Sequence, residues 1–164
     1  MGKLVIIPIV FFVGAAWLRS TVERTAATPV ASKSTATDWK PASCEKKRLC
    51  ITVYIAPWCG VCQASEPTFH AFQLLLPKLR PDVGFGLVIG NASPTQNLKM
   101  KEDLDPIDSF ADDSGSLMRT QKINAFPTWV IRDQAGNEVF RKAGGFQVVS
   151  ESQIEDLLTQ YFKI

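Results

Sequence analysis

The chain has 164 residues and a mass of 18.1 kDa, which suits one globular domain with a short extension and excludes a multidomain enzyme. Eighteen Lys and Arg residues against sixteen Asp and Glu residues give a net charge of +2, and no basic run is long enough for a nucleic-acid footprint. We therefore expect no nucleic acid as a partner. The four cysteines are too few for a fold built on disulfides, so their positions matter more than their number.

The N-terminal residues have the pattern of an export segment. A positive start at Lys3 is followed by fifteen uncharged residues, Leu4–Leu18. A helix that spans a bilayer needs about 17 to 25 apolar residues, so this run fits either a cleaved signal peptide or a short anchor. We predict that residues 1–19 are a signal peptide or N-terminal membrane anchor. The protein is then periplasmic or otherwise extracytoplasmic, and it is held at the inner membrane if the segment is uncleaved.

The next segment, residues 20–43, has the composition of a spacer. Sixteen of its 24 residues are Ser, Thr, Ala or Pro. Such a segment cannot bury enough apolar surface to offset the entropy that it would lose on ordering. We predict a flexible linker at 20–43 and a folded domain at 44–164.

Apolar periodicity predicts the elements of this domain in chain order. A β-branched and aromatic run at 50–56 predicts a buried strand. A helical pattern then runs from Cys59 until Pro77 ends it, with a kink at Pro67. The other predicted elements are strands at 83–89, 129–131 and 138–142 and helices at 98–104 and 150–161. This order predicts an α/β fold with a central mixed β-sheet and helices on both faces.

The closest cysteine pair, Cys59 and Cys62, falls where the first predicted strand gives way to a helix. A sulfur at a helix N-terminus lies near unpaired backbone N–H groups and the positive end of the helix dipole, which favour the thiolate. Cys62 lies about one turn further along the same face, within reach of a mixed disulfide at Cys59. We interpret Cys59 as the attacking thiol and Cys62 as the resolving thiol. By itself, a CxxC pair also occurs in zinc sites and structural disulfides.

The residues around this pair resemble thioredoxins. Ile51–Cys62, ITVYIAPWCGVC, is similar to the active-site strand and turn of that family, and Ala125–Thr128, AFPT, resembles its cis-proline loop. The resemblance covers residues 50–162 and implies a thioredoxin-like fold, a cis bond before Pro127 and thiol-disulfide exchange without a cofactor. The order of tether, spacer and domain resembles the membrane-tethered, TlpA-type members.

The resemblance also implies a substrate site and partners. Pro127 and Gly145 would shape the substrate groove. Trp58 and Phe126 are either core residues or an apolar rim for the substrate. The expected partners are protein thiols or disulfides and a membrane electron donor, with membrane contact through the N-terminal segment if it is uncleaved.

Three features of this region differ from what the relatives have. Ordinary thioredoxins have a buried acid six residues before the first active-site cysteine, whereas this chain has Val53, so a proton relay through that acid is absent. TlpA-type members commonly have a glutamate three residues after the second cysteine, and here that residue is Ser65, with Glu66 next. The dipeptide Gly60-Val61 lacks the histidine of strongly oxidising relatives, which favours a reductant over an oxidant.

The other two cysteines, Cys44 and Cys50, are candidates for a structural disulfide in an oxidising compartment. The alternatives are a second redox relay and a zinc site that uses all four cysteines, although the gap between Cys44 and Cys50 is wider than usual for zinc ligands. We predict no metal. The lone histidine, His70, is roughly 16 Å along the helix from Cys59, too far to act as its base. A non-catalytic binding or assembly module and a metal-handling protein are the alternative functions.

Overall fold

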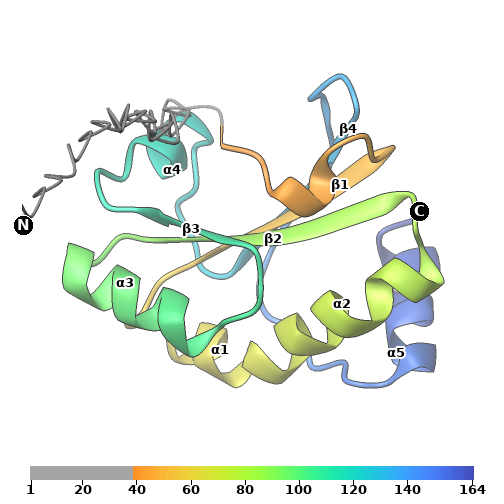
Figure 1. Ribbon diagram of the computed structural model, residues 1–164, viewed down its shortest axis with the longest axis horizontal. Coiled ribbons are helices and arrows are strands. Elements are labelled where there is room, and N and C mark those ends of the chain that lie inside the picture. The colour runs from red at the N-terminus through yellow and green to blue at the C-terminus, as the bar shows by residue number, and fades with distance from the viewer. Residues whose placement is uncertain (1–38) are drawn as a thin grey trace, which may run out of the picture. The chain divides into compact units, whose positions relative to one another are not determined.

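The computed structural model describes residues 39–164, so the predicted export segment and most of the predicted linker lie outside the described residues. One mixed sheet has the strand order β3-β2-β1-β4-β5 (Figure 1). Its strands are β1 (Leu49–Ile55), β2 (Val83–Gly90), β3 (Ser109–Asp112), β4 (Thr128–Asp133) and β5 (Glu138–Ala143). β2 is parallel to β1 and β3, and β4 is antiparallel to β1 and β5. The predicted central mixed sheet is confirmed.

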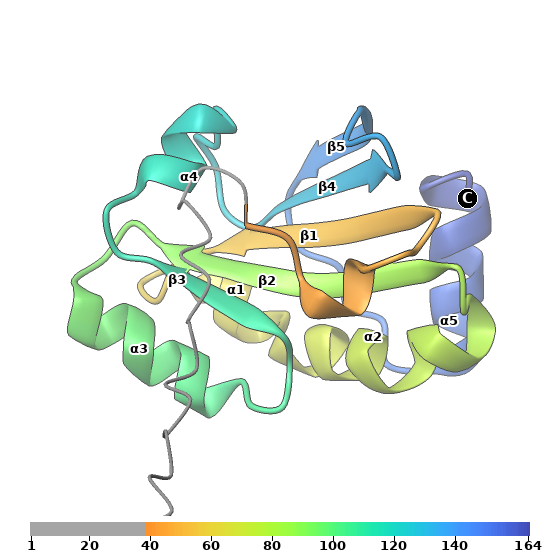
Figure 2. The same ribbon diagram turned by 45° about the horizontal axis from the view of Figure 1, so that its top comes forward.

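The helices cover the two faces of this sheet unequally. They are α1 (Gly60–Ala64), α2 (Glu66–Leu79), α3 (Pro94–Asp103), α4 (Ser116–Thr120) and α5 (Glu151–Asp156), with a π-helical turn at Leu157–Tyr161 and a 3-10 turn at Ala42–Cys44. Figures 1 and 2 show α1, α2, α3 and α5 on one side of the sheet and α4 on the other. Among residues 39–164, no helix has the length and apolar character needed to cross a bilayer.

The larger core lies between the sheet and the longer helices. Side chains alternate along β1, so Ile51 and Val53 face this core while Tyr54 faces the α4 side. Trp129 on β4 is fully buried, and its ring centroid lies 5.9 Å from that of Phe69 and 5.3 Å from that of Phe72, both on α2. These aromatic contacts hold α2, and with it the preceding α1, against the carboxyl end of β1.

Two glycines in β2, Gly84 and Gly86, allow the segment that precedes β1 to pass close to the face of the sheet. A Cβ atom on Gly84 would lie 2.6 Å from the Cα of Cys44, and one on Gly86 would lie 2.5 Å from Cγ of Pro41. Side chains at these positions would push the crossing segment off the strand. Ser43 joins the two, because its hydroxyl accepts the backbone N–H of Phe85 at 3.1 Å. Residues 39–43, part of the predicted linker, therefore pack against the domain, with the Trp39 ring stacked on that of Phe110.

The first helical region differs from the prediction at both of its prolines. Two helices, α1 and α2, meet at Ser65, and Pro67 stands in the first turn of α2, where a backbone N–H is not needed. Pro77 was predicted to end the helix, and this is wrong, because α2 continues to Leu79. A proline in the last turn removes only one hydrogen bond, and the burial of Leu76 holds that turn against the core.

The polar stretch after β2 contains more structure than the sequence predicted. Helix α3 begins at Pro94, four residues before the predicted start, and Ser93 and Gln96 form its capping box. The sequence analysis missed β3 and α4. These elements have only four and five residues, too few for a hydrophobic period to be recognised.

Candidate active site

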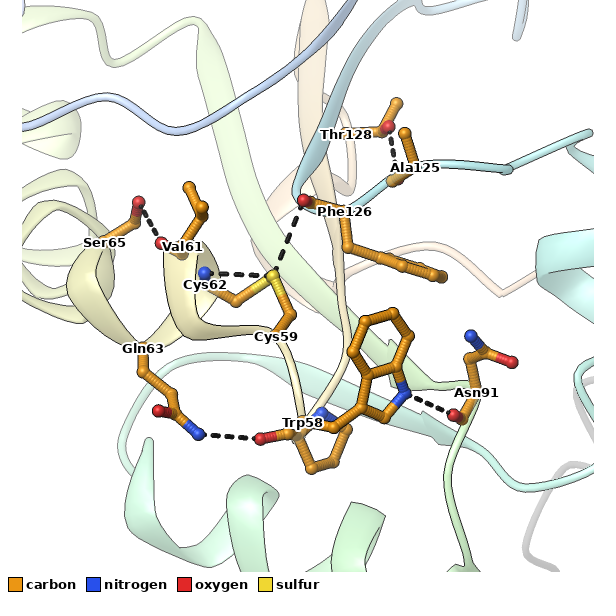
Figure 3. Close-up of a disulfide and its surroundings, with 11 residues drawn as sticks. Trp58, Cys59, Val61, Cys62, Gln63, Ser65, Asn91, Ala125, Phe126 and Thr128 are labelled. Atoms are coloured by element: carbon orange, nitrogen blue, oxygen red, sulfur yellow. Dashed lines mark hydrogen bonds between the residues drawn. A yellow bond between two sulfur atoms is a disulfide. The ribbon is translucent and has the colours of Figure 1, made fainter.

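Cys59 and Cys62 form a disulfide at the start of α1, just beyond the carboxyl end of β1 (Figure 3). The backbone N–H of Cys59 donates to the carbonyl of Ala56 at 3.0 Å and closes the turn between strand and helix. Cys59 is the N-cap residue of α1, and its sulfur accepts the backbone N–H of Cys62 at 3.1 Å. The pair therefore lies at the strand-to-helix junction, where the sequence predicted it.

The two sulfur-bearing residues differ in their access to solvent. Cys59 is 6% exposed, whereas Cys62 is fully buried among the residues of the larger core. Both cysteines belong to the larger core, and Cys59 is the one that keeps some exposure to solvent. The N–H of Cys62 that points to the Cys59 sulfur would also stabilise a thiolate there once the disulfide is reduced.

The loop before β4 faces this disulfide. The peptide bond between Phe126 and Pro127 is cis, as predicted, and the carbonyl oxygen of Phe126 lies 3.5 Å from the Cys59 sulfur. The hydroxyl of Thr128 donates to the carbonyl of Ala125 at 2.7 Å and fixes the loop from within. The fold thus brings together two sequence motifs that are 67 residues apart.

Trp58 and Phe126 flank the disulfide as a pair. The rings meet edge to face with their centroids 5.7 Å apart, and the Trp58 indole N–H donates to the carbonyl of Asn91 at 2.7 Å (Figure 3). Trp58 is 59% exposed, although tryptophan is usually largely buried. Sequence reasoning missed Asn91. Its φ of 57° lies in the left-handed region, which asparagine adopts more readily than most residues. The sequence signal that could have identified Asn91 as a site residue was its position just after a predicted strand.

Gly145 lies against the helix that carries the cysteines. A Cβ atom here would lie 2.8 Å from Cγ1 of Val61 and 2.6 Å from Oγ of Ser65. The neighbouring chain is held to α2 by Thr68, whose hydroxyl donates to the carbonyl of Phe146 at 2.9 Å and accepts the N–H of Val148 at 3.1 Å. Gly145 therefore borders the site, and its contact with a substrate stays a prediction. The sequence analysis missed Thr68, whose conspicuous feature is a buried hydroxyl on a mostly apolar helix face.

At two of the positions where this chain differs from its relatives, Val53 and Ser65, the side chain makes contacts within the domain. Val53 is fully buried and pairs with Trp129 across the sheet, so no carboxyl lies at that point. The hydroxyl of Ser65 donates to the carbonyl of Val61 at 2.8 Å and closes the last turn of α1. Glu66 stands in the first turn of α2, and His70 is exposed on the same helix.

Cys44 and Cys50 form a second disulfide with Cα atoms 5.3 Å apart. It lies at the beginning of β1, whereas the Cys59–Cys62 pair follows the end of that strand. From Cys50 to Ile55 alone the strand extends about 16 Å. Direct exchange between the two pairs and a shared four-cysteine zinc site are both incompatible with this distance. In the part of the chain that the structure describes, no three His, Cys, Asp or Glu side chains are grouped to hold a metal ion.

No family model and no curated protein matches this sequence. Among solved structures, StoA from Bacillus subtilis matches with 23% identity over 69% of this chain and 84% of that chain, at a TM-score of 0.51. The exposed lipoprotein thioredoxin of Streptococcus pneumoniae matches with 20% identity over 70% and 86%, at a TM-score of 0.54. A secreted Mycobacterium tuberculosis disulfide oxidoreductase homologous to DsbE of E. coli matches with 16% identity over 71% and 84%, at a TM-score of 0.51.

These structures support the same conclusion as the features of the chain itself. The five-stranded mixed sheet, the disulfide at the start of α1 and the cis proline opposite it are all present. The predicted fold is confirmed: the chain has the thioredoxin-like fold.

Proposed function

We propose that this protein is a thiol-disulfide oxidoreductase that acts on other proteins, with Cys59 as the attacking thiol and Cys62 as the resolving thiol. The observation that carries the proposal is the difference in exposure between the two cysteines. Cys59 keeps 6% of its surface exposed and directly follows the exposed Trp58, whereas Cys62 is fully buried. A buried structural disulfide would not need this asymmetry, whereas a two-step exchange does.

The proposed reduction proceeds in two displacements. The Cys59 thiolate attacks one sulfur of a substrate disulfide, whose S–S bond breaks, and the other substrate sulfur leaves as a thiolate that takes up a proton. The Cys62 thiolate then attacks the Cys59 sulfur and expels the second substrate sulfur. Two electrons have passed to the substrate, and the protein is left with the Cys59–Cys62 disulfide that the structure contains. These steps need no cofactor.

Local contacts support the first step more than the second. The N–H of Cys62 favours a thiolate at Cys59. The buried Val53, which stands at the position of the acid in ordinary thioredoxins, supplies no carboxyl to take the proton of Cys62. The second displacement therefore has to release that proton to the substrate thiolate or to water.

We place the reaction outside the cytoplasm, as in the TlpA-type group. The apolar run Leu4–Leu18 has the pattern of an export segment or anchor. The structurally similar proteins include one described as secreted and one described as an exposed lipoprotein. The Cys44–Cys50 disulfide supports this location, because disulfides persist mainly in oxidising compartments.

The proposed direction is reduction of the substrate. Gly60-Val61 between the cysteines lacks the histidine of strongly oxidising relatives, and a membrane electron donor would return two electrons to the oxidised pair after each turnover. Titration of the Cys59–Cys62 couple against glutathione tests this direction. We expect a potential near that of thioredoxin, about −270 mV, and a value near −120 mV would contradict a reductant.

The exchange itself is tested by trapping. In a Cys62→Ser variant the mixed disulfide at Cys59 has no resolving thiol, so we expect covalent complexes with partner proteins that dissociate on treatment with dithiothreitol. The measurement is non-reducing electrophoresis of the full chain isolated from its own cells. The matched control, Cys59→Ser, should form none. Absence of complexes from Cys62→Ser, together with failure of reduced Cys59 to be alkylated near neutral pH, would contradict the proposal.

A further inference from the structure

A pocket of about 190 Å³ lies directly beside the candidate active site. One wall is Phe126, whose carbonyl lies 3.5 Å from the Cys59 sulfur, and its rim includes Asn91, which holds the indole of Trp58 (Figure 3). An extended polypeptide advances about 3.3 Å per residue. A substrate bonded through its cysteine to Cys59 would therefore carry neighbouring side chains past this pocket.

The lining of this pocket, which we call the Arg119 pocket, combines apolar walls with a polar rim. The walls are the buried Met118 and the half-buried Ile123 and Phe126. The rim carries the exposed side chains of Arg119, Asn91 and Asn124. This combination fits a side chain with an apolar stem and a polar end group.

Arg119 is held in place but has no charged partner. Its guanidinium donates to the carbonyl of Ser114 at 2.8 Å. The other arginines within residues 39–164 each have a carboxylate oxygen 2.6–3.8 Å away, and no carboxylate is as close to Arg119; they are Arg48, Arg80, Arg132 and Arg141. A guanidinium has five N–H donors in a fixed fork, so several remain for a ligand.

The acidic residues nearest in sequence are engaged elsewhere. The buried carboxylate of Asp112 accepts the backbone N–H of Met118 at 2.9 Å, and that of Asp113 accepts the Asn97 amide at 3.0 Å. Lys122, three residues after Arg119, is exposed and also has no ion-pair partner among the described residues, although it lines a separate pocket. The rim of the pocket therefore presents the uncompensated positive charge of Arg119, and its wall residue Phe126 also borders the Cys59 sulfur.

We propose that the Arg119 pocket binds an acidic side chain of the substrate protein, close in sequence to its reactive cysteine. The methylene groups of a glutamate would lie on Met118 and Ile123, and its carboxylate would pair with Arg119. This inference rests on the proposed function and names its substrate class: proteins whose exchangeable cysteines have a glutamate or aspartate nearby.

The test uses peptides whose single cysteine carries a thionitrobenzoate group. The Cys59 thiolate of the reduced full chain attacks the peptide sulfur and releases the coloured thionitrobenzoate thiolate, and Cys62 then displaces the peptide. One peptide set has a glutamate at each position within three residues of the cysteine, and matched sets have glutamine or lysine. At low salt we expect the best glutamate peptide to react about fivefold faster than its glutamine match, with this ratio falling in 0.5 M salt.

Variants of single charges identify the pocket. Arg119→Gln should lose the preference for glutamate, and Arg119→Glu should prefer the lysine peptide instead. Lys78→Gln, which removes an exposed cation near the far end of α2, should keep the wild-type preference. Two outcomes would overturn the pocket assignment and leave the proposed function untouched. They are equal rates for glutamate and glutamine peptides with the wild-type chain, and a preference for glutamate that persists in Arg119→Gln. No reaction with any peptide would instead count against the proposed function.

Discussion

Replacing Cys59 with serine is expected to slow disulfide exchange by about a thousandfold or more. A serine hydroxyl is not ionised near neutral pH, and so it cannot replace the thiolate as a nucleophile. The remaining thiol of the pair, Cys62, is fully buried and cannot be reached by a protein substrate. The measurement is the second-order rate at which the reduced variant cleaves a protein disulfide, such as those of insulin, compared with the wild-type rate.

The control for this prediction is removal of the other disulfide. A Cys44→Ala, Cys50→Ala double variant should lose about 2 kcal/mol of unfolding free energy, because the closed loop is short. Its exchange rate, measured well below its unfolding midpoint, should stay close to that of the wild type. A Cys59→Ser variant with more than a tenth of the wild-type rate would rule out Cys59 as the attacking thiol. Loss of exchange in the folded double variant would move the chemistry to the other pair.

The largest effect on stability is expected at Trp129. Its side chain is fully buried, and its ring packs against aromatic rings from α2, β2 and the C-terminal segments; these are Phe69, Phe72, Phe85, Phe146 and Phe162. Trp129→Ala leaves a large cavity and should cost about 3–5 kcal/mol. A typical domain has about 5–15 kcal/mol in total, so this variant should be close to unfolding. Chemical denaturation followed by circular dichroism measures the loss.

A second substitution separates packing from polarity at the same position. The indole N–H of Trp129 is buried and has no hydrogen-bond partner, and an unpaired buried donor costs about 1–3 kcal/mol. Trp129→Phe keeps an aromatic ring and removes that donor, so we expect a loss of less than about 2 kcal/mol. The prediction for Trp129→Phe can be tested even if the Trp129→Ala variant does not fold. Equal destabilisation by phenylalanine and alanine would show that the aromatic contacts are not what stabilises this core.

Elements with a strong local signal were predicted well from the sequence. The β-branched run of β1 and the apolar run of β2 are found within one residue of the predicted bounds. The helix predicted from residue 150 begins there, because Ser150 caps α5 through a capping box with Gln153. In each case the residues that form the element also specify it, through their own side-chain period or a cap within one turn.

Short elements and interrupted helices were predicted poorly. β3 and α4 owe their structure to pairing with β2 and to the Asp112 carboxylate that accepts the N–H of Met118. Pro77 stays within α2 because neighbouring residues bury the last turn against the core. Such stabilisation comes from residues distant in the sequence, so no local pattern reports it.

The sequence by itself singled out Cys59 and Cys62 as the candidate reactive pair, because a CxxC at a strand-to-helix junction is a local feature. It also indicated the cis bond before Pro127 through its resemblance to thioredoxins. Only the tertiary structure decided that Cys59 reaches solvent while Cys62 does not, that Asn91 fixes Trp58 beside it, and that Arg119 stands without a carboxylate at the edge of the site. Exposure and pairing depend on which distant segments meet, and that is settled only when the sheet assembles and the helices pack on it.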